Sequence, residues 1–243
     1  MTRYGLIGRS LSHSFSQRYF TEKFDKEGLF GHRYDTFELA DLAEVPDLLR
    51  NTKGLSGFNV TIPYKQEIIP YLDELDATAS AVGAVNTVKI DAGRTMGYNT
   101  DIDGFRATLH PLLQGRTPRA LVLGSGGASR AVAYVLREAG IKFRVVSRSR
   151  ERGDLVWEQL DPVLVNVSTL IINSTPLGME PAPETRPELP YDAIGPKHLM
   201  IDLVYNPERT LFLMEGERRG ARTVNGLTML HAQAEASWDV WHR

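Results

Sequence analysis

The feature of this sequence that most constrains its fold is a short apolar run that ends in a glycine-rich turn. Ala120–Leu123 is followed by Gly124-Ser125-Gly126-Gly127, and a helical pattern then runs from Ala128 to Ala139. Gly140 stands where the C′ residue of such a helix is expected. This order is typical of a dinucleotide-binding domain, because glycines let the backbone approach a pyrophosphate at the helix N-terminus. The same turn also occurs in α/β sheets without this role, so its surroundings decide between the two.

Strand-like and helix-like segments alternate along nearly the whole chain, which predicts an α/β fold with parallel sheets. We expect a first domain of residues 1–103 and 226–243, with a mostly parallel sheet, and a Rossmann-like domain of residues 104–225. The last helix, near Thr228–Trp241, has no strand after it and is expected to return to the first domain. The other predicted strands are Tyr4–Ile7, Arg33–Phe37, Gly57–Val60, Thr87–Ile90, Arg94–Tyr98, Phe143–Val146, Thr169–Ile172 and His198–Leu203, and the other predicted helices are Gln17–Gly28 and Asp41–Asn51.

The composition argues against several classes of function. The 243 residues carry a formal net charge of -2, which gives no sign of a nucleic-acid partner or of a membrane surface. The sequence has no cysteine, so disulfides, thiolate metal sites and cysteine nucleophiles are excluded, and no His/Asp/Glu pattern suggests a metal. The N-terminal residues lack the apolar core of a signal peptide, and no apolar run is long enough to span a bilayer. We therefore expect a cytoplasmic protein.

The segment after the predicted strand Phe143–Val146 indicates which dinucleotide the second domain binds. In this fold an acidic residue at that point binds the ribose 2′-hydroxyl of NAD, whereas an arginine accommodates the 2′-phosphate of NADP. The sequence there reads Ser147-Arg148-Ser149-Arg150-Glu151-Arg152. Guanidinium groups form paired, charge-assisted hydrogen bonds with phosphate, and the serines add neutral donors. Arginines are common in solvated loops, but their position here favours NADP.

Three stretches of the first domain are more polar than packing requires, namely Gly8–Ser16, Gly57–Lys65 and Gly97–Gly104. The first follows a predicted strand, and the other two each place a charged group just beyond a strand end, where α/β sheets bind ligands. The hydroxyls of the first stretch can hold a carboxylate, although serine is also a preferred helix cap. Lys65 and Asp101 would form an acid–base pair if they met in a cleft, because each shifts the protonation of the other. Taken singly, they fit a surface lysine and a helix cap.

Together these segments resemble the shikimate dehydrogenases, relatives of the quinate/shikimate dehydrogenases, over nearly the whole chain. The Ser-His-Ser-x-Ser loop at 12–16 resembles the family's substrate-carboxylate loop, and Asn59–Lys65 resembles its most diagnostic motif. These and six further motifs occur in the order that the family shows, which is very improbable by chance. The six are Gly83–Thr87, Asn99–Gly104, Gly124–Arg130, Asn173–Met179, Asp202–Pro207 and Asn225–Leu230 with Gln233.

The resemblance implies a role for each candidate site residue. Lys65 and Asp101 would be the catalytic pair. Ser14 and Ser16, with Tyr205, would hold the ring carboxylate of the substrate. The residues that would bind ring hydroxyls are Thr61, Asn86 and Gln233. The residues that would bind the cofactor are Gly124, Gly126, Gly127 and Ala128 in the glycine turn, Ser147, Arg148, Ser149 and Arg152 near the 2′-phosphate, and Thr175, Leu177, Met179, Gly226 and Met229 around the nicotinamide.

The resemblance also implies the reaction: reversible reduction of 3-dehydroshikimate to shikimate by NADPH, a step in chorismate and aromatic amino-acid biosynthesis. Such a protein is an oxidoreductase that acts on a CH–OH group without a metal, as a monomer or a homodimer. Two alternatives stay open. One is a paralogue that prefers another ring acid or NAD, and the other is a non-catalytic relative that binds a metabolite and regulates. Ser14 and Ser16 favour shikimate over quinate, and the Lys65/Asp101 pair argues against a protein that only binds.

The chain departs from the family pattern at several positions. Gln17 stands where the family usually has proline, Ser147 replaces an asparagine before the phosphate-binding arginine, and Thr228 interrupts a common Gly-Leu-Gly-Met pattern. The segment between Arg152 and Thr169 is shorter than is typical, so we expect a strand or helix there to be trimmed. None of these changes removes a catalytic group.

Overall fold

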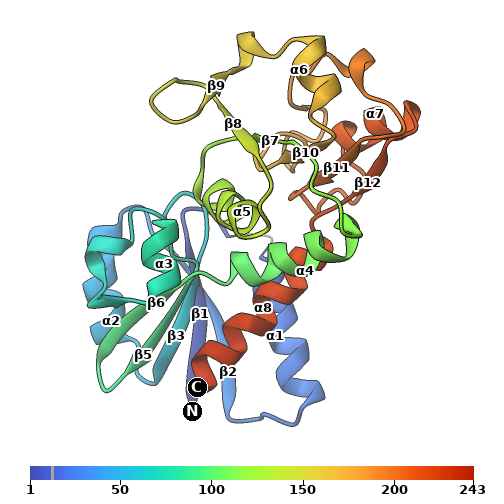
Figure 1. The fold of residues 1–243 in the computed structure, drawn as a ribbon. Coiled ribbons are helices and arrows are strands. Elements are labelled where there is room, and N and C mark those ends of the chain that lie inside the picture. Colours follow the sequence, from blue (N-terminus) through green and yellow to red (C-terminus); the bar gives the residue numbers. More distant parts are fainter. Residues whose placement is uncertain (12–13) are drawn as a thin grey trace. The chain divides into compact units, whose positions relative to one another are not determined.

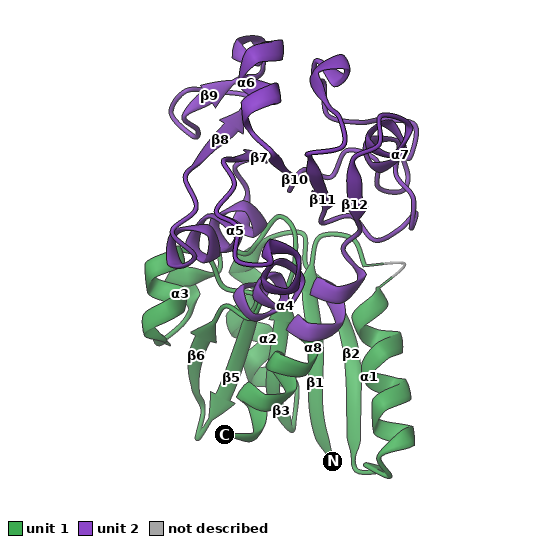
Figure 2. Cartoon of the chain, turned by 45° about the vertical axis from the view of Figure 1, so that its right-hand side comes forward, with its two compact units in different colours: residues 1–100, 234–243 green, residues 101–233 purple. Residues whose placement is uncertain are grey.

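The computed structural model describes residues 1–11 and 14–243 (Figure 1). Within these residues the strands form two sheets of six. The chain divides into two compact units, residues 1–100 with 234–243 and residues 101–233 (Figure 2). The predicted α/β class is confirmed. The predicted domain division differs from these units in residues 101–103 and 226–233, which belong to the second unit.

The first unit is built on one mixed sheet, which is mostly parallel as the sequence predicts. Its strands are β1 (Thr2–Gly8), β2 (His32–Glu38), β3 (Leu55–Val60), β4 (Glu74–Leu75), β5 (Thr87–Asp91) and β6 (Arg94–Tyr98). They lie in the order β2-β1-β3-β5-β6-β4, with β1 parallel to both neighbours and β5 antiparallel to β3 and β6. Because β1 and β3 run in the same direction, the polar segments that follow them start at the same edge of the sheet.

The helices of the first unit are short, except for the first and the last. They are α1 (Phe15–Lys26), η1 (Leu42–Glu44), α2 (Val45–Asn51), η2 (Ile69–Tyr71), α3 (Ala77–Val82) and the C-terminal part of α8 (Leu227–His242). Trp241 of α8 stacks on Tyr4 with ring centroids 4.4 Å apart and donates a hydrogen bond to the Val88 carbonyl at 3.0 Å. A methyl group at Gly57 would lie 2.3 Å from the Trp241 indole nitrogen, so only glycine leaves room for this contact. The last helix therefore ends in the core of the first unit, as predicted.

The second unit has a parallel sheet in the order β12-β11-β10-β7-β8-β9. Its strands are β7 (Ala120–Leu123), β8 (Phe143–Ser147), β9 (Leu155–Val156), β10 (Leu170–Asn173), β11 (Leu199–Asp202) and β12 (Arg222–Val224). Its helical segments are α4 (Asp101–Leu113), α5 (Gly127–Glu138), η3 (Trp157–Gln159), α6 (Pro162–Val167), η4 (Tyr191–Ala193), α7 (Leu211–Arg218) and the start of α8. Counted along the chain, this is the doubly wound order 3-2-1-4-5-6 of dinucleotide-binding domains, with the order reversing between β7 and β10. The predicted Rossmann-like arrangement is confirmed.

The segment after Arg152 forms only short elements. It contains the two-residue strand β9, the turn η3 and the six-residue helix α6. The six-stranded sheet is nevertheless complete, because even two residues of β9 suffice to pair with Val146 and Ser147 of β8. Among the described residues, no helix has both the length and the apolar character that crossing a membrane would require.

Candidate functional site

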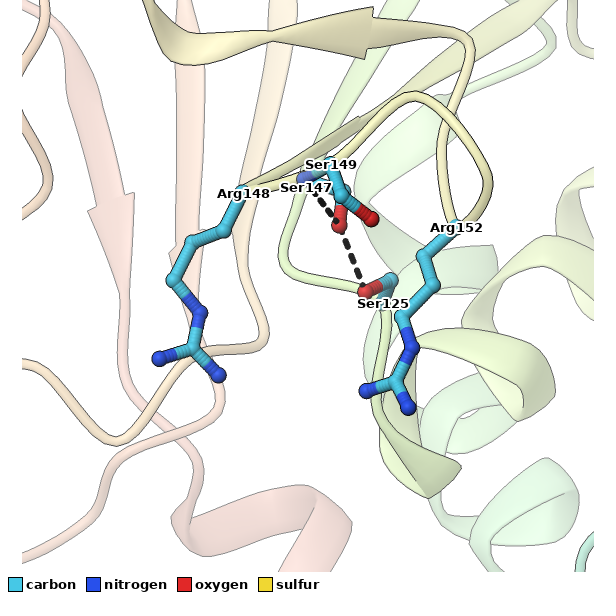
Figure 3. Close-up of a pocket in the computed structure, with 5 residues that line it drawn as sticks. All are labelled: Ser125, Ser147, Arg148, Ser149 and Arg152. Carbon is cyan, nitrogen blue, oxygen red and sulfur yellow. Dashed lines mark hydrogen bonds between the residues drawn. The ribbon is translucent and has the colours of Figure 1, made fainter.

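A pocket of about 230 Å³ lies at the end of β8 in the second unit (Figure 3). Its lining residues are Ser125, Ser147, Arg148, Ser149 and Arg152. The two arginine side chains flank the serines and extend in the same direction from the loop, as Figure 3 shows. The hydroxyls of Ser125 and Ser147 are hydrogen-bonded at 2.9 Å. The structure thus brings together the four residues predicted to bind a 2′-phosphate and adds Ser125 from the glycine turn.

The chemistry of this pocket fits a phosphate group. Two guanidinium groups supply positive charge and bidentate donors, the serines supply neutral donors, and the lining residues include no acid. Glu151 directly precedes the lining residue Arg152 in the sequence but does not itself line the pocket. Hydrogen bonds from its own backbone N–H and from the Ser149 hydroxyl hold the pKa of its carboxyl below the usual range, so it is ionised at neutral pH. Within this loop the two pocket arginines outweigh that single charge.

The glycine turn between β7 and α5 has the shape that a pyrophosphate site needs. Gly124 has a φ of +107°, and a methyl group there would lie 3.0 Å from both Ser174 Oγ and Thr175 Cγ2. A residue with a side chain is therefore excluded by both the backbone and the neighbouring loop. Gly126 is the N-cap of α5, and a methyl group on it would meet nothing within 4 Å. Gly127 and Ala128 then open the helix, whose first N–H groups have no carbonyl partner within the helix itself.

The ends of β10 and β11 are joined by a buried polar network. The Asp202 carboxylate accepts hydrogen bonds from Asn173 Nδ2 at 2.9 Å, from the Val204 N–H at 3.0 Å and from the Thr210 hydroxyl at 2.6 Å. Asn173 in turn accepts from the Thr175 N–H at 3.0 Å and the Thr175 hydroxyl at 2.6 Å. Sequence reasoning missed this network. Its only signal was a polar residue at the end of each of two apolar strands.

The buried Asp202 carboxyl is expected to make the stability of the protein depend on pH. Burial raises the pKa of Asp202 to about 6, with hydrogen bonds from Thr210, Val204 and Asn173 opposing the rise. In an unfolded chain the pKa of an aspartate is about 3.9. The folded state binds the Asp202 proton more tightly than the unfolded state does. The contribution of this proton to the free energy of unfolding is therefore complete below about pH 4 and is lost as the pH rises through about 6.

We therefore expect the free energy of unfolding of the wild type, relative to Asp202→Asn, to fall between about pH 4 and pH 7. Urea denaturation of both proteins across that range measures this difference. A difference that does not change with pH would contradict the raised pKa.

The remaining predicted nicotinamide-side residues lie on the loops around this network. Leu177 donates its N–H to the Thr175 hydroxyl at 3.2 Å, and the Met179 N–H bonds the Pro176 carbonyl at 3.1 Å. Gly226 donates its N–H to the Val204 carbonyl at 3.1 Å, and a methyl group there would lie 2.2 Å from the Leu203 carbonyl oxygen. Tyr205 follows Val204 on the same loop. All of these residues belong to the second unit.

In the first unit, Lys65 and Thr100 are both anchored on the segment before β5. The Val85 N–H donates to the Lys65 carbonyl at 2.7 Å. The side chain of Asn86, the next residue, accepts from the Thr100 N–H at 2.7 Å and donates to the Thr100 hydroxyl at 3.0 Å. Asp101 follows Thr100 directly, so Asn86 fixes the backbone from which the second catalytic candidate begins. This is a structural task for Asn86 beside its predicted role with a ring hydroxyl.

The network around Asn86 extends through the core of the first unit. Asn59 Nδ2 donates to Thr87 Oγ1 at 3.1 Å and to Ser237 Oγ at 2.9 Å, and its Oδ1 accepts from the Tyr34 phenol at 2.8 Å. Thr100 Oγ1 lies 3.0 Å from Ser237 Oγ. Residues far apart in the sequence thus hold the turn before Asp101, which the sequence alone did not reveal.

The predicted carboxylate loop is described only in part, since Ser12 and His13 lie outside the described residues. Ser14 is the N-cap of α1, and its hydroxyl accepts from the Gln17 N–H at 3.3 Å. Ser16 lies in the first turn of α1, where its hydroxyl hydrogen-bonds the Tyr34 phenol. Thr61 follows β3, and its N–H donates to the Ile7 carbonyl at 2.9 Å, at the end of β1. Thr61 thus lies just after one strand end, and Ser14 and Ser16 lie at the helix start that follows β1 at the same edge of the sheet.

Asp101 and Gln233 lie on two helices that pack closely within the second unit. Asp101 is the first residue of α4 and is 4% exposed, so its carboxylate lies at the positive end of that helix. One turn later, a methyl group on Gly104 would lie 2.5 Å from the Met229 carbonyl oxygen and 3.1 Å from Gln233 Cβ of α8. Gly104 therefore sets the spacing between the helix of Asp101 and the helix of Gln233.

We expect Gly104→Ala to lower the free energy of unfolding by about 1–3 kcal/mol, because the nearest atom is backbone and cannot move aside. Gly195→Ala is the matched control, since a methyl group there meets nothing within 4 Å. Chemical denaturation of both variants measures the effect. Equal stability of the two variants would show that α4 and α8 have room to separate.

Comparison with known proteins shows similarity along the whole chain. Residues 6–88 match the model of the shikimate dehydrogenase substrate binding domain. The shikimate dehydrogenase (NADP(+)) of Methanococcus maripaludis is 36% identical, over 98% of this chain and 90% of that protein.

Solved structures show the same similarity. The shikimate 5-dehydrogenase of Thermus thermophilus, in complex with NADP(H) and shikimate, has a TM-score of 0.85 at 33% identity, over 99% of this chain and 93% of that one. The quinate dehydrogenase of Corynebacterium glutamicum, in complex with NAD, has a TM-score of 0.87 at 28% identity, over 99% and 93% of the two chains.

Proposed function

Since the chain belongs to the shikimate dehydrogenase family, we propose that it catalyses the reversible, NADPH-dependent reduction of 3-dehydroshikimate to shikimate. The observation that carries the proposal is the pocket at the end of β8. There, two arginines and three serines line a space suited to a 2′-phosphate, in a sheet with the strand order of a dinucleotide-binding domain. A dehydrogenase that used NAD would have no need of two guanidinium groups at this point.

The proposed chemistry uses one proton from this chain. A bound NADPH would supply the hydride for the ring carbonyl carbon. Lys65, as an ammonium ion, stabilises the negative charge that develops on the carbonyl oxygen and donates a proton to it, which leaves the ring alcohol and a neutral amine. Solvent then returns a proton to Lys65. Asp101 orients Lys65 and accepts a hydrogen bond from the neighbouring ring hydroxyl.

The other proposed roles concern binding. Ser14, Ser16 and Tyr205 hold the ring carboxylate, and Thr61, Asn86 and Gln233 bind ring hydroxyls and so select the face of the ring that reacts. The cofactor is held by the glycine turn at Gly124, Gly126, Gly127 and Ala128, by Ser147, Arg148, Ser149 and Arg152 at the 2′-phosphate, and by Thr175, Met179 and Gly226 near the nicotinamide. Holding both reactants in place lowers the barrier, because their relative motion no longer has to be restricted in the transition state. The working unit, a monomer or a homodimer, and its place in the cytoplasm stay predictions.

The experiment is a four-way assay of the purified protein with shikimate or quinate and with NADP or NAD, followed by nicotinamide absorbance. We expect shikimate with NADP to give the highest kcat/KM, because both the serines of α1 and the arginines after β8 fit that pair. Quinate with NAD is the competing result, motivated by the likeness to a quinate dehydrogenase that binds NAD. If the protein binds NADPH tightly but oxidises neither shikimate nor quinate, the result would favour the alternative of a non-catalytic relative that binds a metabolite and regulates.

A further inference from the structure

We propose that Asp202 is a positioning residue for the nicotinamide half of the cofactor, because it joins the two loops that the proposed function places around that ring. The inference rests on the proposed function for the assignment of those loops. Asp202 has no part in the proposed proton transfer, yet its side chain is completely buried. A buried acid is costly to ionise, and an apolar side chain would avoid that cost at a position that only fills space. Its presence therefore calls for a task other than packing.

The first arm of the network reaches the Thr175–Met179 loop through Asn173. The carboxylate accepts from Asn173 Nδ2 at 2.9 Å, which fixes the amide so that its oxygen faces Thr175. That oxygen accepts two hydrogen bonds from Thr175, at 3.0 Å from the N–H and 2.6 Å from the hydroxyl. The Asn173 amide also donates to the Leu177 carbonyl at 3.3 Å. If the amide turned over, these donors and acceptors would oppose one another, so the ionised Asp202 sets the conformation of the loop.

The second arm reaches the turn before α8 through Val204. Asp202 accepts from the Val204 N–H at 3.0 Å, and the Val204 carbonyl accepts from the Gly226 N–H at 3.1 Å. Gly226 packs directly on the Leu203 backbone, so a shift of that loop moves the start of α8. The same carboxylate also accepts from Thr210, the N-cap of α7, at 2.6 Å. One side chain therefore fixes both expected walls of the nicotinamide pocket.

This arrangement separates the two ends of the cofactor. The phosphate pocket lies on β8 and the glycine turn, on the other side of β7 from β10 and β11. None of its lining residues takes part in the Asp202 network. A change at Asp202 should consequently reach the nicotinamide end and leave the phosphate end intact. A purely structural role for Asp202 would not make this distinction.

The test compares two ligands on Asp202→Asn and the wild type by calorimetry. Adenosine 2′,5′-bisphosphate carries the phosphate end alone, whereas NADPH carries both ends. We expect the variant to weaken NADPH binding about tenfold, the size expected for losing a hydrogen bond to a charged group, with the Kd of the bisphosphate unchanged within about twofold. Asp161→Asn is the matched control. It makes the same substitution in a carboxylate that caps α6, and both Kd values should stay as in the wild type.

If Asp202→Asn does not fold, Asn173→Ala cuts the first arm from the other side and is expected to show the same selective loss. Parallel weakening of both ligands, or no weakening of NADPH, would overturn the proposal. Because these are binding measurements, they are independent of turnover. A wild type that binds NADPH but does not oxidise shikimate would refute the proposed function. The comparison of Kd values between Asp202→Asn and the wild type would still test the role of Asp202.

Discussion

Lys65→Ala is expected to lower kcat for shikimate oxidation by about a thousandfold while changing the KM for shikimate only a few-fold. General acid–base catalysis by a positioned side chain contributes about 10²–10⁴ in rate, and Lys65 would act mainly on charge that develops during the reaction. Its backbone carbonyl is held by Val85, so the loop should keep its shape when the side chain is shortened. Steady-state kinetics with NADP, followed by nicotinamide absorbance, measure both constants.

Lys53→Ala is the matched control for this prediction. Lys53 is an exposed lysine of the same unit, in the turn after α2, and its replacement should leave kcat as in the wild type. A Lys65→Ala enzyme with a near-normal kcat would remove Lys65 from the mechanism. A large rise in KM with an unchanged kcat would instead make it a binding residue, which contributes equally before and during the reaction.

Arg148→Ala is expected to lower kcat/KM for NADPH about a hundredfold and to leave kcat/KM for NADH nearly unchanged. A charge-assisted contact to phosphate is worth about 1.5–3 kcal/mol, and NADH has no 2′-phosphate with which to make it. Arg148 is exposed and lies at the wall of the β8 pocket, so its loss should not disturb packing. The measurement is the ratio of the two kcat/KM values in the variant and the wild type.

Arg150→Ala provides the control, because Arg150 lies between the two pocket arginines in sequence but does not line the pocket. It carries the same charge on the same loop, so a general electrostatic effect of the loop would appear equally in both variants. An equal loss for NADPH and NADH in Arg148→Ala would rule out the 2′-phosphate role.

Most regular elements of this fold could be predicted because their signals are local. The strand at Ala120–Leu123, the glycine turn and helix α5 follow one another within twenty residues, and the β5–β6 hairpin closes on Asp91-Ala92-Gly93. The short strands β4, β9 and β12 escaped prediction, because two or three residues show no periodicity and become strands only by pairing with a neighbour. Helix α4 escaped prediction for another reason: its first residues carry the polar pattern of a site motif.

In the candidate site, too, some residues could be predicted from local signals and others are brought together only by tertiary contacts. Ser147, Arg148, Ser149 and Arg152 lie within six residues of chain, so the sequence by itself predicted that they act together, and the structure then showed one pocket lined by all four. The sequence could not show that Ser125 hydrogen-bonds Ser147 across the ends of β7 and β8, because that contact depends on the pairing of the two strands.

The Asp202 network and the Gly104 contact were decided by the tertiary structure alone. Asp202 lies 29 residues from Asn173, and the two meet because β10 and β11 pair in parallel and end together. Gly104 meets Met229 only because α4 packs against the start of α8. The physical reason is the same in both cases. A local pattern specifies which backbone conformation a segment prefers, whereas a buried hydrogen bond or a close helix contact exists only once distant segments have packed together.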